Sequence, residues 1–373
     1  MNKKYRVGII GFGHMHINNV AGLFAQHPQV EWVACSDTHP LVPELREAPY
    51  TRAWNMKHAL HKLDVPKAYP DYHEMLEKEK FDIIICCSEN AQHPDVVEAC
   101  ATAGVNVCVE KPMAASLSDA LRMVRACQAA GTKMLINWPL TWDPKARKIK
   151  ELIDQGVIGK VLEIKWRSGH TGPLGPGAAH AGVDEIAAPL SGPERGATWW
   201  HQQAAGGGAM LDYCCYGAMV SLWYIGEQAN AAWGLRANLD SHWGDADDNA
   251  AMMVRFPGAM AILEGSWTTL DHGVSGGPIV YGSTGTLLMD YENPGVRLSK
   301  GHERVTYIDV DSLPKGRMDI AQEFIYHLET GRPVHQTLEM MFNLNAMAIL
   351  DAGVRSSISG KLELIDNTTW CIG

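Results

Sequence analysis

Residues 6–16 read Arg-Val-Gly-Ile-Ile-Gly-Phe-Gly-His-Met-His, and this stretch decides the fold that we expect for the rest of the chain. A short run rich in β-branched residues opens into a turn that contains Gly11 and Gly13, and a helical pattern follows over 17–26. A strand, a glycine turn and a helix in this order are typical of a dinucleotide-binding sheet. Gly11 permits the tight turn, and Gly13 lets a pyrophosphate approach the helix N-terminus. His16 stands where the fingerprint has a third Gly or Ala, so the motif alone is weak.

The next predicted strand, 30–35, supports the same interpretation because it ends in Ser36-Asp37. An acidic residue about 20 positions beyond the glycine turn receives the ribose 2′-hydroxyl of NAD, whereas the 2′-phosphate of NADP requires Arg or Lys. Asp37 therefore favours NAD over NADP. The alternative is an Asp that simply ends a strand.

A second stretch, Gly104 to Met113, carries a charged pair at the end of a predicted buried strand. The strand-like residues 105–109 lead directly into Glu110-Lys111-Pro112, and ligands of open α/β sheets bind outside the carboxyl ends of the strands. Pro112 fixes φ and removes a backbone donor, which holds Lys111 at a defined place, as a catalytic lysine requires. The alternative is a surface Glu-Lys pair before an ordinary turn.

Strand and helix patterns alternate through the first 137 residues, which implies a doubly wound parallel sheet. The pattern predicts strands at 81–87, 105–109 and 133–137 and helices at 72–80, 95–103 and 118–130. An irregular insertion at 41–68 contains a helical stretch at 52–63, and the sequence gives it no function.

The pattern changes after Asn137, so we divide the chain into domains at 1–137 and 138–373. A loop rich in Gly, Pro and Ala at 169–198 is long enough to be functional or disordered. Several strand-like runs then follow without helices between them, which argues for an open, mostly antiparallel sheet. Those runs are 250–256, 259–266, 278–281, 285–290 and 304–310, with helices expected at 144–155, 319–329 and 338–357 and a strand at 161–168. We expect the last helix, 338–357, to pack back on the domain junction.

Length, charge and cysteine content limit the possible functions. The 373 residues suffice for two domains with real cores. The net charge of -10, without basic runs, argues against nucleic acid or an anionic membrane as partner. No window approaches the ~18 apolar residues of a membrane span, and the charged start leads into a strand rather than a signal peptide. Nine cysteines, four of them in adjacent pairs, fit a reducing cytoplasm.

A third motif lies between the long loop and the predicted sheet. Trp199-Trp200-His201 precedes the run 206–217, which reads Gly-Gly-Gly-Ala-Met-Leu-Asp-Tyr-Cys-Cys-Tyr-Gly. Asp212 and Tyr216 are four residues apart, so on a helix both project from one face. The alternative is a glycine-rich hinge before a core helix in which Tyr216 is a buried aromatic.

With these motifs in order, nearly the whole chain resembles the Gfo/Idh/MocA family of NAD(P)-dependent oxidoreductases. The resemblance implies an N-terminal NAD-binding Rossmann domain and a C-terminal α/β domain that binds substrate and forms a homodimer or homotetramer through its open sheet. It also implies that Lys111 is the catalytic lysine and that Asp212 contacts substrate hydroxyls. Many members have His where this chain has Tyr216; Tyr is the pattern of the branch that looks like glucose-fructose oxidoreductase and dihydrodiol dehydrogenase. Glu89, where Pro is frequent, and His16 depart from the pattern.

The expected site residues fall into three groups. The catalytic residues are Lys111, Tyr216 and Asp212. NAD, or less favourably NADP, is expected to contact Gly11, Phe12, Gly13, His14, Met15, Asp37, Ser88, Asn90, His93, Glu110 and Lys111. The substrate is expected to contact Lys111, Trp142, His170, Trp200, His201, Asp212 and Tyr216. We expect no metal site, because His14 and His16 lie in the glycine turn, His58 and His61 lack further ligands nearby in sequence, and the sequence has no Cys-x-x-Cys pair.

The leading hypothesis is an NAD-dependent dehydrogenase of a sugar, cyclitol or related polyol. Oxidising a secondary alcohol requires a base for the hydroxyl proton. Tyr216 has an ordinary pKa of about 10, and Lys111 could stabilise its phenolate. An alternative is an NAD-dependent glycoside-cleaving enzyme that uses transient oxidation and elimination, for which His170, His180 and His201 could serve. A non-catalytic NAD sensor is disfavoured by the joint presence of Lys111 and Tyr216.

Overall fold

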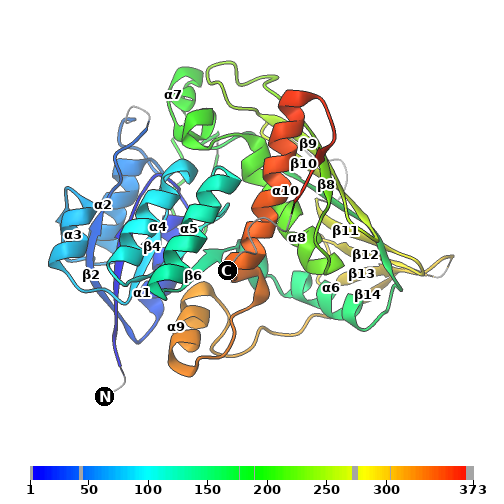
Figure 1. The fold of residues 1–373 in the computed structure, drawn as a ribbon, viewed down its shortest axis with the longest axis horizontal. Coiled ribbons are helices and arrows are strands. Elements are labelled where there is room, and N and C mark those ends of the chain that lie inside the picture. Colours follow the sequence, from blue (N-terminus) through cyan, green and yellow to red (C-terminus); the bar gives the residue numbers. More distant parts are fainter. Residues whose placement is uncertain are drawn as a thin grey trace.

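The structure, a computed structural model, describes residues 3–41, 45–175, 177–188, 190–270, 276–302 and 304–366. A parallel sheet with its helices lies on the left of Figure 1, an open sheet lies on the right, and helix α10 (Met340–Ser359) stands between them. All strands of the parallel sheet precede residue 138 and those of the open sheet follow it. The division into domains at 1–137 and 138–373 stays a prediction.

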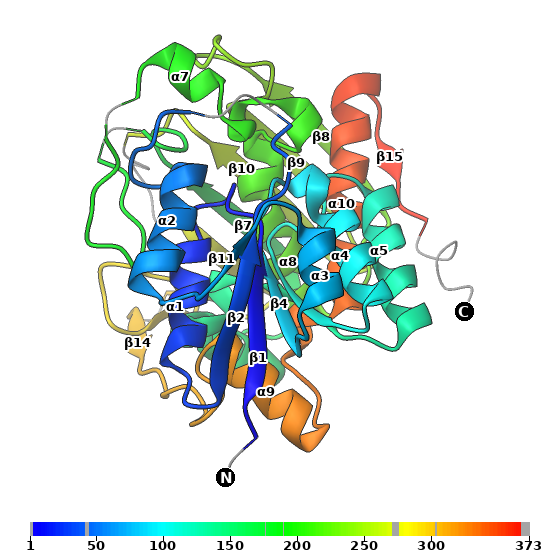
Figure 2. The ribbon, with the colours of Figure 1, turned by 90° about the vertical axis from the view of Figure 1, so that its left-hand side faces the viewer.

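The first sheet has, among the described residues, six parallel strands in the order β3-β2-β1-β4-β5-β6. Helices cover both of its faces, with α1 and α2 on one side and α3, α4 and α5 on the other (Figure 2). The strand order reverses between β1 and β4, the place where ligands bind in doubly wound sheets. The elements are β1 (Tyr5–Ile10), α1 (Ile17–Gln26), β2 (Val30–Ser36), α2 (Arg52–Lys62), β3 (Ala68–Tyr69), α3 (Tyr72–Lys78), β4 (Ile83–Cys86), η1 (Asn90–Gln92), α4 (His93–Thr102), β5 (Asn106–Glu110), α5 (Leu117–Ala130) and β6 (Met134–Asn137).

The second sheet has nine strands within the described ranges, in the order β14-β13-β12-β11-β7-β10-β9-β8-β15. Its pairs are antiparallel except for β7 with β10, so the sheet is mixed but mostly antiparallel, and the predicted fold class is confirmed. The strands are β7 (Val161–Gly169), β8 (Ala231–Ala237), β9 (Asn249–Arg255), β10 (Met260–Ser266), β11 (Gly277–Gly282), β12 (Thr286–Met289), β13 (Val296–Ser299), β14 (Thr306–Ile308) and β15 (Glu363–Leu364). The helical segments are η2 (Pro139–Trp142), α6 (Pro144–Asp154), α7 (Gly192–Gly196), η3 (Trp199–His201), η4 (Gln203–Ala205), η5 (Met210–Cys214), α8 (Cys215–Ile225), α9 (Ile320–Thr330), η6 (Gln336–Leu338) and α10.

Helix α10 contacts both halves of the molecule. It packs on β8, α8 and α5. Asn343 accepts a hydrogen bond from Trp138 Nε1 at 2.7 Å, and the hydroxyls of Thr141 and Thr337 are 2.6 Å apart just before the helix begins. At Gly234 of β8 an added Cβ would lie 2.3 Å from the carbonyl oxygen of Gly353, so the strand and the helix meet without side chains between them.

The open sheet differs from the sequence prediction in the strands at and next to its two edges. The run predicted at 304–310 forms a strand over Thr306–Ile308, and β8, β13 and β15 were not predicted. Strand β8 reads Ala-Ala-Trp-Gly-Leu-Arg-Ala, which lacks the β-branched residues that mark a strand, and at Gly234 α10 approaches too closely for a side chain. Its far face exposes Leu235, and neighbouring strands expose Met253 and Met260 on the same side.

Two further findings, on membrane spans and on cysteines, apply to the described part of the chain. None of its helices combines the length and the apolar character that a membrane crossing requires. The eight cysteines within it are buried free thiols.

Candidate active site

A cavity of about 320 Å³ lies where the carboxyl ends of the parallel strands meet the second half of the chain. The glycine turn forms one wall, Lys111 and the segment around Asp212 form another, and part of the long loop covers them. The lining residues are His14, Met15, His16, Lys111, His170, Thr171, Gly172, Pro173, Leu174, Gly177, Ala178, Ala179, His180, Trp200, Asp212, Tyr213 and Tyr216.

The glycine turn after β1 has little room for side chains. Gly11 has φ of 91°, and a Cβ there would lie 2.6 Å from the backbone nitrogen of Ser88. A Cβ at Gly13 would lie 3.0 Å from a guanidinium nitrogen of Arg52. The turn is tied to the next strand because Phe12 donates its backbone N–H to Asp37 Oδ1 at 2.9 Å. Gly11 is therefore required by its conformation and by the close approach of Ser88, whereas a side chain at Gly13 would have to displace the end of Arg52.

Three buried polar atoms near this turn have no partner among the described residues. Asn90 donates through Nδ2 to the carbonyl of Gly206, which leaves Oδ1 unpaired. His93 bonds through Nδ1 to the carbonyl of Met113, which leaves Nε2 unpaired. His14 Nε2 is also unpaired. A buried unsatisfied polar atom costs about 1–3 kcal/mol, so a polar ligand that supplies the missing partners fits here, and a nicotinamide dinucleotide has suitable hydroxyl, amide and phosphate groups.

Lys111 and Asp212 form an ion pair between the two halves of the chain. Lys111 Nζ lies 2.7 Å from Asp212 Oδ1, and the lysine is 2% exposed. Burial opposes the charged amine, but Asp212 and Tyr216 raise the pKa of Lys111 well above its usual value. Burial also opposes the charge of Asp212, but Lys111 outweighs it and lowers the pKa of that carboxyl. Both groups are therefore charged at neutral pH.

Two residues that the sequence did not single out hold Asp212 in place. Trp267, which directly follows β10, donates Nε1–H to Asp212 Oδ2 at 3.0 Å. Asp247 accepts the backbone N–H of Met210 at 2.8 Å and so caps the short π-helical segment η5 that carries Asp212. Gly208, with φ of 113°, makes room for that cap, since a Cβ there would lie 2.5 Å from Asp247 Oδ1. The π-helical turn is a frequent feature of functional sites.

Tyr216 lies under Lys111, with the lysine Nζ 4.8 Å from the ring centroid. Its ring stacks on Trp166 at 5.6 Å and meets the edge of Trp138 at 5.3 Å. Burial raises the pKa of Tyr216 above its usual value, and the opposing effect of Lys111 is smaller. Lys111 therefore stabilises the phenolate, as the sequence suggested, but the desolvation that comes with burial has the larger effect.

Hydrogen bonds join the long loop at 169–198 to the insertion at 41–68. The Tyr50 hydroxyl accepts the backbone N–H of His180 at 3.2 Å and donates to the carbonyl of Glu185 at 2.5 Å. His170 and His180 both line the cavity. Burial lowers the pKa of His170, and it lowers that of His180 to about 4, so both rings are neutral at pH 7.

The structure brings most of the predicted site residues together, but not Trp142 and His201. Trp142 lies at the start of the second half, where Arg147 stacks over its ring at 5.6 Å. His201 is fully buried behind the cavity wall, with its ring centroid 5.0 Å from that of Trp267. Neither lines the cavity, whereas Trp200 does.

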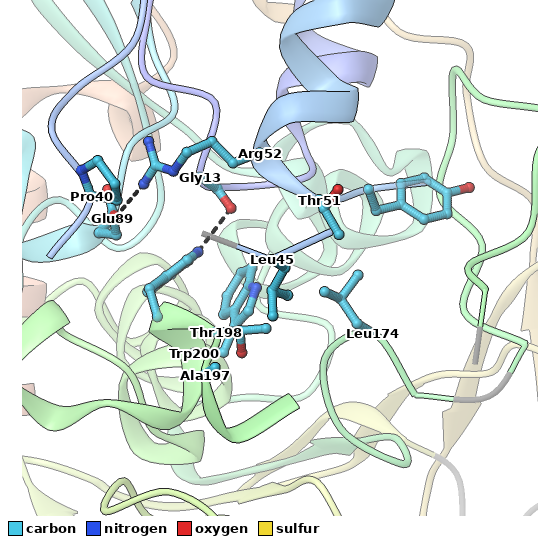
Figure 3. A pocket seen from close by; sticks show the side chains of 12 residues that line it. Gly13, Pro40, Leu45, Thr51, Arg52, Glu89, Leu174, Ala197, Thr198 and Trp200 are labelled. Atoms are coloured by element: carbon cyan, nitrogen blue, oxygen red, sulfur yellow. Dashed lines mark hydrogen bonds and ion pairs between the residues drawn. The ribbon is translucent and has the colours of Figure 1, made fainter. Parts of the chain in front are cut away.

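A narrower space of about 40 Å³ lies on the other side of the glycine turn (Figure 3). One guanidinium nitrogen of Arg52 lies 2.6 Å from Asp37 Oδ1. Another contacts the buried carboxylate of Glu89, and a dashed line joins Arg52 and Glu89 in Figure 3. Trp199 donates Nε1–H to the carbonyl of Gly13 at 2.8 Å and closes the space from the second half. This is the place that the fold assigns to the adenosine end of a dinucleotide.

Comparisons with known proteins agree with this geometry. Residues 5–137 match the sequence model of the Gfo/Idh/MocA oxidoreductase family with an NAD-binding Rossmann fold, and residues 146–288 match the Gfo/Idh/MocA C-terminal domain. A myo-inositol 2-dehydrogenase of Thermotoga maritima is 24% identical over 88% of this chain and 89% of its own. A D-xylose 1-dehydrogenase [NADP(+)] of Haloarcula marismortui is 25% identical over 69% of this chain and 68% of its own.

A solved structure shares the fold over the whole length. The aldose-aldose oxidoreductase from Caulobacter crescentus, complexed with glycerol, has a TM-score of 0.75 at 20% identity and covers 97% of this chain and 100% of its own. The prediction of an NAD(P)-dependent dehydrogenase is confirmed as to the class of enzyme, while the branch indicated by Tyr216 stays a prediction. With both halves matched, the chain belongs to the Gfo/Idh/MocA family of oxidoreductases.

Proposed function

We propose that the protein transfers a hydride between a secondary alcohol of a sugar, cyclitol or related polyol and the nicotinamide of NAD. The observation that carries this proposal is the placement of Lys111, Asp212 and Tyr216 on one wall of a cavity whose other wall is the glycine turn. Charged and hydroxyl groups suited to a polyol thus face the place where the fold presents a nicotinamide. The names of the two relatives, which act on a cyclitol and a sugar, support the same substrate class.

The proton chemistry follows from the charges. A bound nicotinamide supplies the hydride acceptor or donor. Because the pKa of Tyr216 is raised, its hydroxyl is protonated at neutral pH and suited to give a proton to a carbonyl oxygen during reduction. The Lys111 ammonium stabilises negative charge on that oxygen, and Asp212 accepts hydrogen bonds from the other hydroxyls of the substrate. In oxidation the same groups act in reverse, with Tyr216 as the base.

NAD is the proposed cofactor because of how Asp37 is held. Its Oδ1 receives the backbone N–H groups of Phe12 and Thr38 and the guanidinium of Arg52. No hydrogen bond to Oδ2 occurs within the described ranges, so this oxygen can accept a ribose hydroxyl. A 2′-phosphate would add negative charge beside Asp37 and Glu89, which already share Arg52 as their cation. The NADP-dependent relative makes this choice the first point to test.

A second candidate is NAD-dependent glycoside cleavage by transient oxidation and elimination. It is favoured by four histidines on the cavity wall, namely His14, His16, His170 and His180. Elimination next to a carbonyl requires a further base, which simple alcohol oxidation does not. This candidate predicts that a glycoside is consumed without lasting accumulation of NADH.

We also propose a cytoplasmic homo-oligomer. The buried free thiols fit a reducing compartment. The exposed Leu235, Met253 and Met260 on the uncovered face of the open sheet suit a contact between copies of the chain.

The deciding experiment follows NADH absorbance (about 340 nm) with NAD, then NADP, against a panel of polyols, inositols, sugars and glycosides. Wild-type protein is compared with Lys111→Ala and with Lys57→Ala, whose lysine pairs with Glu47 on the surface. We expect NADH with a free polyol in the wild type and in Lys57→Ala, and its loss in Lys111→Ala. The proposal fails if an identified substrate is turned over equally by all three proteins.

A further inference from the structure

Two histidines of the glycine turn lie beside a carboxylate from the end of β5. Ligand atoms of His14, His16 and Glu110 all lie within 4.8 Å of one another. His16 Nδ1 is 2.9 Å from Glu110 Oε1, and the two histidine ring centroids are 4.3 Å apart. The parallel sheet brings these groups together across 94 residues, which is why spacing in the sequence gave no sign of them.

Among the described residues, no lysine or arginine forms an ion pair with the Glu110 carboxylate. Its side chain is 0% exposed, and its bonded neighbours are the His16 ring and the amide of Asn137, at 3.2 Å. The ammonium of the adjacent Lys111 is bonded to Asp212 instead. Buried charges in proteins are paired or coordinate metals. His14 is 1% exposed, its Nδ1 accepts the backbone N–H of His16 at 3.1 Å, and its Nε2 has no partner in the described part of the chain.

We propose that His14, His16 and Glu110 bind a divalent first-row transition-metal ion at the wall of the cavity. Two imidazoles and one carboxylate form a donor set that suits Zn²⁺ and also Fe²⁺, Co²⁺ or Ni²⁺, and it leaves coordination positions open. His14 and His16 line the cavity, so the open positions face it. If the proposed polyol oxidation is correct, two neighbouring substrate hydroxyls can occupy those positions.

Binding requires a small rearrangement. Ligand atoms about 2.0–2.2 Å from an ion are roughly 3–3.5 Å apart, so a set spanning 4.8 Å must contract. His16 can move, because its side chain is 21% exposed while His14 and Glu110 are enclosed. The bonds to the ion then replace the contact between His16 Nδ1 and Glu110 Oε1. His180, whose ring centroid is 5.6 Å from that of His16, stands near enough to supply a further nitrogen after rotation.

The test is metal binding by the full-length protein, without a polyhistidine tag and after treatment with a chelator. Zn²⁺ and Co²⁺ are titrated in turn, bound metal is counted by mass spectrometry after gel filtration, and the visible absorption of Co²⁺ reports its ligand field. Wild type is compared with His16→Ala and His16→Gln and with a matched control, His58→Ala, whose ring stacks on Trp54 away from the cavity. Circular dichroism confirms that each variant is folded, and NADH binding is measured on the same samples.

We expect one equivalent of metal per chain in the wild type and in His58→Ala, and at least tenfold weaker binding in both His16 variants. Absence of saturable binding to the wild type, or binding that survives both His16 substitutions, overturns the site. Since NADH binding is recorded separately, a missing metal site and a failed cofactor proposal give different results.

Discussion

Two cation–carboxylate groups lie on opposite sides of the glycine turn, and they differ in the number of carboxylates that are paired with the cation. Lys111 holds one carboxylate, Asp212, which comes from the other half of the chain, and both line the open cavity. Arg52 holds two, Asp37 and Glu89, both from the first half, beside a space of about 40 Å³. Lys111 and Asp212 can therefore still interact with a substrate. Arg52 is already paired with two carboxylates, so we expect it only to hold its surroundings in position. We therefore expect a chemical role for the pair of Lys111 and Asp212 and a structural role for Arg52 with its two carboxylates.

The largest expected effect is that of Lys111→Ala. Removing the ammonium takes charge stabilisation from the reacting oxygen, and we expect kcat to fall about 10³-fold, which corresponds to about 4 kcal/mol. Asp212 is then buried without its cation, so the melting temperature should also fall. Steady-state kinetics and thermal unfolding check both effects. A tenfold loss or less would show that Lys111 only holds Asp212.

On the opposite side, Arg52→Met should act on stability and cofactor binding more than on chemistry. It leaves Glu89 buried without a cation, at a cost of about 3 kcal/mol in the free energy of unfolding. The double variant Arg52→Met/Glu89→Gln should recover most of that loss, which urea denaturation can measure. With saturating NAD, kcat should stay within a few-fold of wild type. If kcat instead fell as far as in Lys111→Ala, the separation of roles would be wrong.

Tyr216→Phe keeps the ring that stacks on Trp166 and removes the hydroxyl. We expect kcat to fall about 10²-fold with little change in NADH affinity or melting temperature. Because burial raises the pKa of Tyr216 above about 10, the phenolate forms only at alkaline pH, so the oxidation rate of the wild type should keep rising to at least about pH 10. The variant should lose this pH dependence, and an unchanged slope would assign the proton to another group.

The smallest expected effect is that of Trp267→Phe, which removes one hydrogen bond to Asp212. We expect kcat/KM to fall about tenfold, near 1.4 kcal/mol. The lost N–H helped to lower the pKa of Asp212, so this pKa should rise and activity should be lost at a higher pH on acidification. A uniform fall at all pH values would indicate a packing defect instead.

The sequence predicted the parts of the fold and site that depend on local pattern. Strand β4 is a short apolar run between turn signals, and Lys111 directly follows a strand, so both could be found from neighbours in sequence. Strand β8 could not be found in this way, because its Gly234 packs against Gly353 of a helix that lies more than 100 residues later. Trp267 and Asp247 could not either, since they reach the site from loops whose position only the folded sheet defines.

Helix α10 also bears on how far the two halves of the molecule can move relative to each other. Its bond to Trp138 and its packing on β8 join the two sheets into one unit, so we expect little hinge motion between them. Access to the cavity then depends on residues 177–188, which the Tyr50 hydroxyl holds through His180 and Glu185. We therefore expect Tyr50→Phe, which removes both of these hydrogen bonds, to shorten the residence time of a bound ligand.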